Sequence, residues 1–117
     1  MNERQALSVL AALSQETRLR IVRLLVVAGK EGLAAGAIAE RLGTAASTLS
    51  FHLKELDQAG LVRSRRESRS ILYSAEYDAL SELIRFLMED CCAGRPGGCE
   101  PALDAATACC APTASAI

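Results

Sequence analysis

The chain has 117 residues, 50% of them hydrophobic, and a formal net charge of −1. This length supports one domain, whose small core we expect to be helped by formation of a homodimer. Two Tyr, two Phe and no Trp argue against an aromatic platform for stacked bases. No apolar stretch approaches the roughly 20 residues that span a bilayer, so we expect a cytoplasmic protein without a membrane partner.

The predicted elements begin with a short amphipathic helix over residues 4–13, where leucines recur every three positions. Ser14 is expected to cap a second helix, and the broad apolar run over 19–27 is typical of a central core helix. A glycine-containing break precedes a short third helix within 33–42, which Gly43 is expected to end. These segments predict a helical bundle.

A fourth helix is predicted over 45–59, with Thr44 as its cap and leucines on its inward face. Together with the preceding helix it predicts a helix-turn-helix, a motif in which the second helix enters the major groove of DNA. Hydroxyl groups in the first turns of such a helix can contact phosphates or base edges. The positions expected to face outward, and hence to contact DNA, are Ser47, Thr48, Ser50 and His52.

An arginine-rich stretch over 63–69, flanked by β-branched and aromatic residues, predicts a two-stranded hairpin, or wing. We expect Arg65, Arg66 and Arg69 to contact phosphates or the minor groove. The last helix is predicted over 76–90, and its exposed leucines are expected to form a dimer surface. The fold class is therefore mainly α (α+β): a winged helix-turn-helix of five helices and a two-stranded hairpin, occupying residues 1–90.

The segment 91–117 is expected to be a flexible, cysteine-rich sensing tail. In a reducing cytoplasm these thiols are expected to be ligands or redox-active groups rather than structural disulfides. Three thiolates suit trivalent arsenic or antimony, whereas four suit zinc, cadmium or lead, and a disulfide switch is a further alternative. The predicted ligands are Cys91, Cys92 and Cys99, with Cys109 and Cys110 as accessory thiols.

Three strings, over residues 13–25, 47–56 and 59–62, resemble the ArsR/SmtB family of winged-helix metalloregulatory repressors. The resemblance implies a homodimer that represses at a palindromic double-stranded operator until an inducer ion binds. It also implies that the outward residues of the fourth helix enter the major groove and that the three arginines lie at the wing tip. The Cys-x-Cys motif of the best-known arsenic members is absent from 33–38. The C-terminal cysteines instead resemble those of an arsenite-responsive subgroup.

The function predicted from these features is repression of an arsenic-resistance operon, relieved by As(III), Sb(III) or methylarsenite. Two alternatives keep the DNA-binding domain and make the thiols a redox sensor or a zinc, cadmium or lead sensor. A third is a thiol carrier or interaction module in which the winged helix binds protein instead of DNA. An enzyme is not expected, because the sole histidine lies on the predicted DNA-facing helix without a catalytic partner. No organic cofactor is expected.

Overall fold

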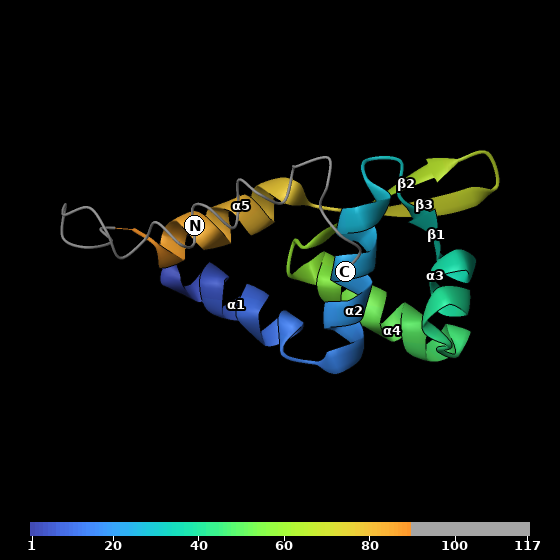
Figure 1. Cartoon of the computed structure of the whole chain (residues 1–117), viewed down its shortest axis with the longest axis horizontal. Coiled ribbons are helices and arrows are strands. Elements are labelled where there is room, and N and C mark those ends of the chain that lie inside the picture. Colours follow the sequence, from blue (N-terminus) through green and yellow to red (C-terminus); the bar gives the residue numbers. More distant parts are fainter. Residues whose placement is uncertain (90–117) are drawn as a thin grey trace, which may run out of the picture. The chain divides into compact units, whose positions relative to one another are not determined.

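The computed structural model describes residues 1–89, which form five helices and three strands (Figure 1). The elements in chain order are α1 (Glu3–Leu13), α2 (Glu16–Ala28), β1 (Leu33–Ala34), α3 (Ala35–Leu42), α4 (Ala46–Gln58), β2 (Val62–Glu67), β3 (Ser70–Ala75) and α5 (Tyr77–Leu87). The predicted five helices and hairpin wing are confirmed, and β1 is an addition. Within residues 1–89 no helix is long and apolar enough to cross a membrane.

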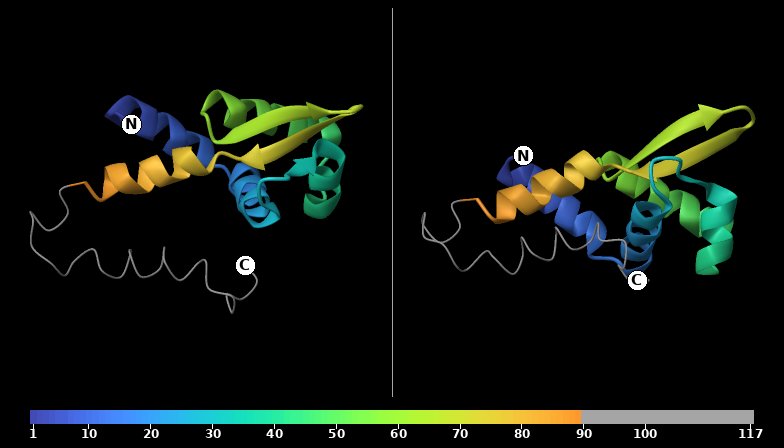
Figure 2. Two further views of the ribbon diagram at one scale, coloured as in Figure 1. Left: turned by 90° about the horizontal axis from the view of Figure 1, so that it is seen from above. Right: turned by 45° about the horizontal axis from the view of Figure 1, so that its top comes forward.

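The sheet is antiparallel, with the strand order β1-β3-β2. Its short outer strand pairs Leu33 with Tyr73. Gly32, just before β1, has a φ of +75° and lies so close to the Tyr73 carbonyl group that a side chain would clash with it. The β2–β3 hairpin extends away from α5, as both views of Figure 2 show. The hairpin is thus anchored at its base and free at its turn.

One hydrophobic core receives side chains from all five helices, including Val9 of α1 and Leu83 of α5. Full burial of a large aliphatic side chain stabilises a fold by roughly 1.5–3 kcal/mol, so a few such residues hold the helices together. The three leucines predicted to face inward on α4 are buried. The largest fully buried side chains are Ile21, Leu25, Ile38, Leu49, Leu56 and Leu61.

Helix α1 turns its smaller side chains toward the core and two of its leucines toward solvent. Ala6 and Val9 are buried, whereas Leu7 is 60% exposed and Leu10 is also exposed. The predicted leucine stripe therefore exists, but most of it does not contribute to the core of a single chain. A leucine-rich exposed helix face is typical of a surface that another protein covers.

The two predicted N-caps are wrong. The Ser14 hydroxyl donates to the Ala11 carbonyl at 2.7 Å, so it closes α1, and the Gln15 side chain caps α2 instead. The Thr44 backbone N–H bonds the Ala39 carbonyl at 3.1 Å and so completes the end of α3. Because both residues belong to the end of the preceding helix, they cannot take the extended N-cap conformation of the next one.

Candidate nucleic-acid interface

The connection between α3 and α4 is a tight turn built around Gly43. This residue ends α3 in the left-handed conformation, with a φ of +64°, as predicted for a C-terminal glycine. Ile38 of α3 and Leu49 of α4 are both buried in the common core, so the two helices are held at a fixed angle. The pair has the form of a helix-turn-helix, with α4 as its second helix.

The outward face of α4 is mostly small and polar. Ser47, Thr48 and Ser50 are exposed, so the structure places these three predicted contact residues where DNA could reach them. Two further exposed residues, Phe51 and Lys54, lie on the same helix and were not predicted as contacts. Phe51 and Lys54 follow Ser47 by four and seven residues, and residues at this spacing share one face of a helix. The sequence alone could therefore have predicted that they lie beside Ser47.

His52 was predicted to face outward and does not. Its side chain is only 7% exposed and lies on the buried side of α4. Within the described residues its Nδ1 atom has no hydrogen-bond partner. Burial lowers the pKa of His52, the nearby positive charge of Arg18 lowers it further, and Glu55 opposes both effects. A neutral, enclosed imidazole cannot act as a phosphate-binding cation.

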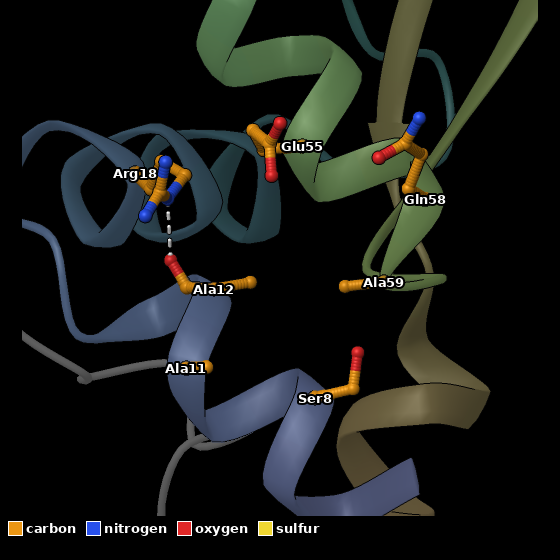
Figure 3. Close-up of a pocket in the computed structure, with 7 residues that line it drawn as sticks. All are labelled: Ser8, Ala11, Ala12, Arg18, Glu55, Gln58 and Ala59. Atoms are coloured by element: carbon orange, nitrogen blue, oxygen red, sulfur yellow. Dashed lines mark hydrogen bonds between the residues drawn. The ribbon is translucent and has the colours of Figure 1, made fainter.

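Arg18 and Glu55, the two charged neighbours of His52, line a small cavity between α1, α2 and α4 (Figure 3). The cavity has a volume of about 240 Å³, and Ser8 and Gln58 supply further polar groups to its wall. Arg18 Nε donates to the Ala12 carbonyl at 2.8 Å, which satisfies part of the exposed backbone at the end of α1. Arg18 therefore connects α2 to the end of α1 through this hydrogen bond, next to α4.

The three wing arginines occupy different environments. Arg69 lies in the turn between β2 and β3, and Arg66 is exposed one position before Glu67. Neither makes a hydrogen bond or ion pair with another side chain within residues 1–89. Arg65 is opposite Leu72, farther from the turn, so its predicted place at the wing tip is wrong. Arg66 and Arg69 remain free to contact a ligand.

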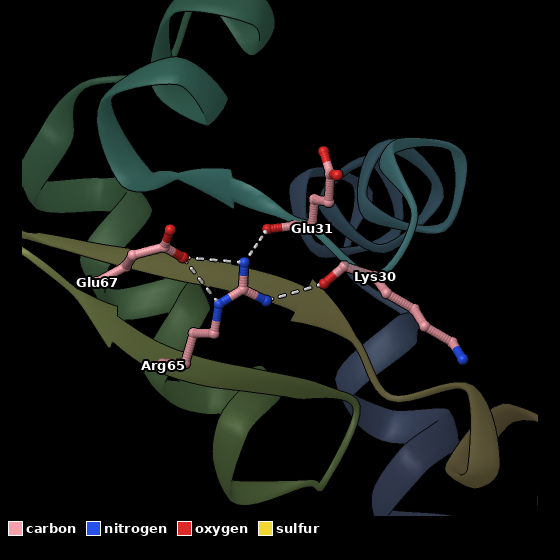
Figure 4. A network of polar contacts seen from close by, with 4 residues as sticks. All are labelled: Lys30, Glu31, Arg65 and Glu67. Atoms are coloured by element: carbon pink, nitrogen blue, oxygen red, sulfur yellow. Dashed lines mark hydrogen bonds and ion pairs between the residues drawn. The ribbon is translucent and has the colours of Figure 1, made fainter.

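The Arg65 guanidinium group connects the wing to the loop after α2 (Figure 4). Nη1 donates to the Lys30 carbonyl at 3.0 Å and Nη2 donates to the Glu31 carbonyl at 3.0 Å. Nε donates to the Glu67 carboxylate at 3.3 Å. An exposed ion pair contributes little, so the two carbonyl bonds carry most of this connection.

The comparisons with known proteins agree with this geometry. A family model described as a helix-turn-helix domain matches residues 13–65. The uncharacterized helix-turn-helix regulator YceK of Bacillus subtilis is 37% identical over 81 residues, which cover 69% of this chain and 80% of YceK. A solved ArsR-like transcriptional regulator from Rhodococcus sp. RHA1 is 31% identical, with a TM-score of 0.67 and 90% of each chain covered. The chain belongs to the ArsR family.

As an ArsR-family regulator, the protein is a DNA-binding transcriptional regulator and not an enzyme. Another solved relative is the homodimeric winged helix-turn-helix DNA-binding domain Mb0332 of Mycobacterium bovis. It is 28% identical, with a TM-score of 0.59, and the match covers 75% of this chain and 82% of that one.

The regulator also exposes aliphatic side chains on two other helices, and we call this set the leucine face: Leu7 and Leu10 of α1 and Ile84 of α5. Ile84 is 52% exposed. Ala6 of α1 and Leu83 of α5, one position from these residues, are buried in the same core. The two helices are therefore fixed to one core while each presents aliphatic side chains to solvent.

The predicted metalloid ligands lie outside the described residues. These ligands are Cys91, Cys92, Cys99, Cys109 and Cys110. Residues 1–89 contain no group of three or more His, Cys, Asp or Glu side chains that could hold a metal ion. The prediction of a C-terminal thiol site in this ArsR-family chain therefore depends on the sequence alone.

Proposed function

We propose that this ArsR-family regulator is a homodimeric repressor of an arsenic-resistance operon, released from its operator by trivalent arsenic or antimony. The observation that carries the proposal is the segregation of the cysteines. All five follow α5, and the first pair begins four residues after its last residue, Leu87, at Cys91. The DNA-binding residues precede α5. The thiols are therefore attached to a helix that also contributes to the leucine face.

Dimer formation is supported by the leucine face. Covering Leu7, Leu10 and Ile84 with a second copy removes aliphatic surface from water, at a gain of roughly 25 cal/mol per Å². A two-fold dimer presents two α4 helices and two wings to DNA. Such dimers bind half-sites about 34 to 36 Å apart, so the relative position of the two helices controls affinity.

The donor set of the tail fits a soft trivalent ion. Cys91 and Cys92 are adjacent, and Cys99 follows after six residues that include three Gly and one Pro. When bound, the ion supplies a crosslink between these three sulfur atoms and requires no fourth ligand. Cys109 and Cys110 would supply additional thiols for an ion that prefers four ligands. The chain meanwhile has to lose protons from its thiols before they can bind an ion.

Release from DNA requires the inducer to bind the two states of the dimer with different affinity. Because α5 belongs to both the core and the leucine face, a constraint at its end can change how the two subunits are arranged. Coupling between two sites is typically about 5- to 150-fold in affinity, and the effect is reciprocal. Operator DNA is therefore expected to weaken inducer binding by the same factor.

The test is a fluorescence-anisotropy titration with duplex DNA from upstream of the regulator's own gene. Arsenite should lower the affinity of the wild-type protein for this DNA by at least fivefold. Cys91→Ser and Cys92→Ser should bind the DNA normally and resist release, because each leaves only two of the three ligands. Cys110→Ser is the matched control and should be released like the wild type. Release of either of the first two variants at the wild-type arsenite concentration would contradict the assignment.

Parallel titrations distinguish the related inducers and the alternatives. Antimonite should act like arsenite, and methylarsenite, which needs only two thiols, should still release both serine variants because each keeps two. Release by zinc, cadmium or lead that requires Cys109 and Cys110 would identify a four-thiolate sensor. Release by peroxide, with a disulfide detected by mass spectrometry, would identify a redox switch. Absence of any salt-dependent DNA binding would favour a protein-interaction module.

A further inference from the structure

Phe51 is the exception on the outward face of α4. Its side chain is 56% exposed, although the neighbouring outward positions are hydroxyl-bearing or charged. Phe51 follows Ser47 by four residues and precedes Lys54 by three, so the three side chains share one face of the helix. An aromatic ring is thus presented in the middle of the surface that this helix-turn-helix offers to DNA.

The Phe51 ring also contacts a buried ring of the same helix. The adjacent His52 is buried, and the two rings meet edge to face, with centroids 5.5 Å apart and an interplanar angle of 61°. A contact of this kind has a preferred geometry, and a phenylalanine side chain has only two rotatable bonds. Little conformational entropy is therefore lost when the exposed edge of Phe51 contacts a ligand.

The floor of the major groove offers one apolar group, the C5-methyl of thymine. A ring without donors or acceptors cannot hydrogen-bond a base edge, but it can cover this methyl and exclude water from it. We propose that Phe51 contacts a thymine methyl group in the major groove and makes the regulator select thymine at that position of each half-site. The inference rests on the proposed function only for DNA binding by α4, not for release by arsenic.

Two other uses of the ring fit the structure less well. Side chains that intercalate and kink DNA act from the minor groove, whereas the second helix of a helix-turn-helix enters the major groove. A protein-docking patch requires several adjoining apolar side chains. Among the described residues of α4, Phe51 is the only large hydrophobic side chain that is exposed. A single apolar ring among polar side chains can cover one methyl group but is too small to dock a protein.

The test removes only the methyl group. The wild-type protein selects its preferred duplex from a random-sequence pool, and each dT of that duplex is then replaced singly by dU. Burial of one methyl group contributes about 0.8 kcal/mol, so the decisive single replacement should weaken binding about fourfold, and the same replacement in both half-sites about 15-fold. Phe51→Ala removes the contact from both subunits, so it should bind the dT duplex about 15-fold more weakly than the wild type and should not distinguish dT from dU at that position.

Val27→Ala is the matched control, because Val27 is an exposed aliphatic residue on α2, outside the α4 face. It should keep the full preference for dT. The inference is overturned if no dU replacement weakens wild-type binding, or if Phe51→Ala retains the preference. Failure of the wild type to select any duplex would overturn DNA recognition by α4 as well. The wild type could instead select a duplex and show a Phe51-dependent preference for dT, yet not be released by arsenite. This result would support the inference and contradict only the sensing half of the proposed function.

Discussion

The α4 and wing surface and the leucine face are both exposed, but they are built from opposite chemistry. The first presents Ser47, Ser50 and the arginines Arg66 and Arg69, with Phe51 as its one large apolar group on α4. The second presents aliphatic side chains on two helices. Water solvates the first surface well and the second poorly. In the proposed function the first surface contacts the phosphates and bases of DNA and the second contacts another copy of the chain.

The strongest test of this assignment places charge on the leucine face. We expect the double variant Leu10→Glu and Ile84→Glu to be monomeric, because dimer formation would bury four unpaired carboxylates. A monomer occupies one half-site and loses the advantage of two linked binding events. Its affinity for operator DNA should therefore fall about 100-fold or more. Sedimentation velocity and fluorescence anisotropy would measure the two effects.

Val27→Glu provides the control for this experiment. Val27 is 62% exposed, as much as Leu7, but it lies on α2 and outside the leucine face. This variant should stay dimeric and bind DNA like the wild type. A monomeric Val27→Glu protein, or a dimeric double variant, would show that the subunits associate through another surface.

The sequence predicted the elements better than it predicted which way single residues face. Inward leucines at 49, 53 and 56 follow from helical spacing, and the structure buries them. His52 lies three positions after Leu49 and four before Leu56, so the same spacing places it inward although its side chain is polar. The exposure of Leu7 could not be deduced, because periodicity shows that a helix is amphipathic without identifying what covers its apolar side.

Long-range contacts account for the other differences. Strand β1 has two residues, and only their pairing with Tyr73 and Leu72 of β3, about 40 positions further along the chain, makes it a strand. The carbonyl groups that bind Arg65 belong to residues 34 and 35 positions away. The sequence does not show which main-chain carbonyl groups accept hydrogen bonds from a side chain. It therefore could not distinguish the role of Arg65 from those of Arg66 and Arg69. All three are exposed, but the structure separates Arg65, which is hydrogen-bonded to the loop after α2, from Arg66 and Arg69, which are not.

A smaller effect is expected when the wing is loosened from the body. In Arg65→Lys, the charge remains but a single ammonium group cannot bridge the carbonyls of both Lys30 and Glu31. Loss of about one hydrogen bond should weaken DNA binding roughly three- to tenfold. The dependence of affinity on salt should not change, because no phosphate contact is lost. Amide hydrogen exchange should increase in the loop over residues 29–32.

Arg66→Gln is the matched comparison one residue away. If Arg66 contacts a phosphate in each half-site, its removal from both subunits should reduce the slope of log affinity against log salt concentration by about 1.8. Arg66→Lys should retain that slope. Should Arg65→Lys bind DNA like the wild type while Arg65→Gln reduces the slope, Arg65 would be a phosphate contact and the described bonds to the loop would not be needed for binding.

The smallest expected effect is a change of stability with pH, which tests whether His52 lies on the buried side of α4. Burial and the charge of Arg18 lower the pKa of His52 below 6.5 in the folded protein, with Glu55 as the opposing charge. The unfolded chain therefore binds more protons than the folded one as the pH falls through about 6.5, and its stability should decrease there. The melting temperature should thus fall more between about pH 8 and pH 5.5 in the wild type than in His52→Gln.

A phosphate-contacting histidine would have the opposite signature. Protonation would then add a cation at the DNA surface, so acidification would strengthen operator binding in the wild type and not in His52→Gln. Because His52 is enclosed by the core side of α4, we expect no such gain at temperatures where both proteins remain folded. A gain in DNA affinity at low pH would place His52 on the DNA surface. A loss of stability without such a gain would place it in the core behind that surface.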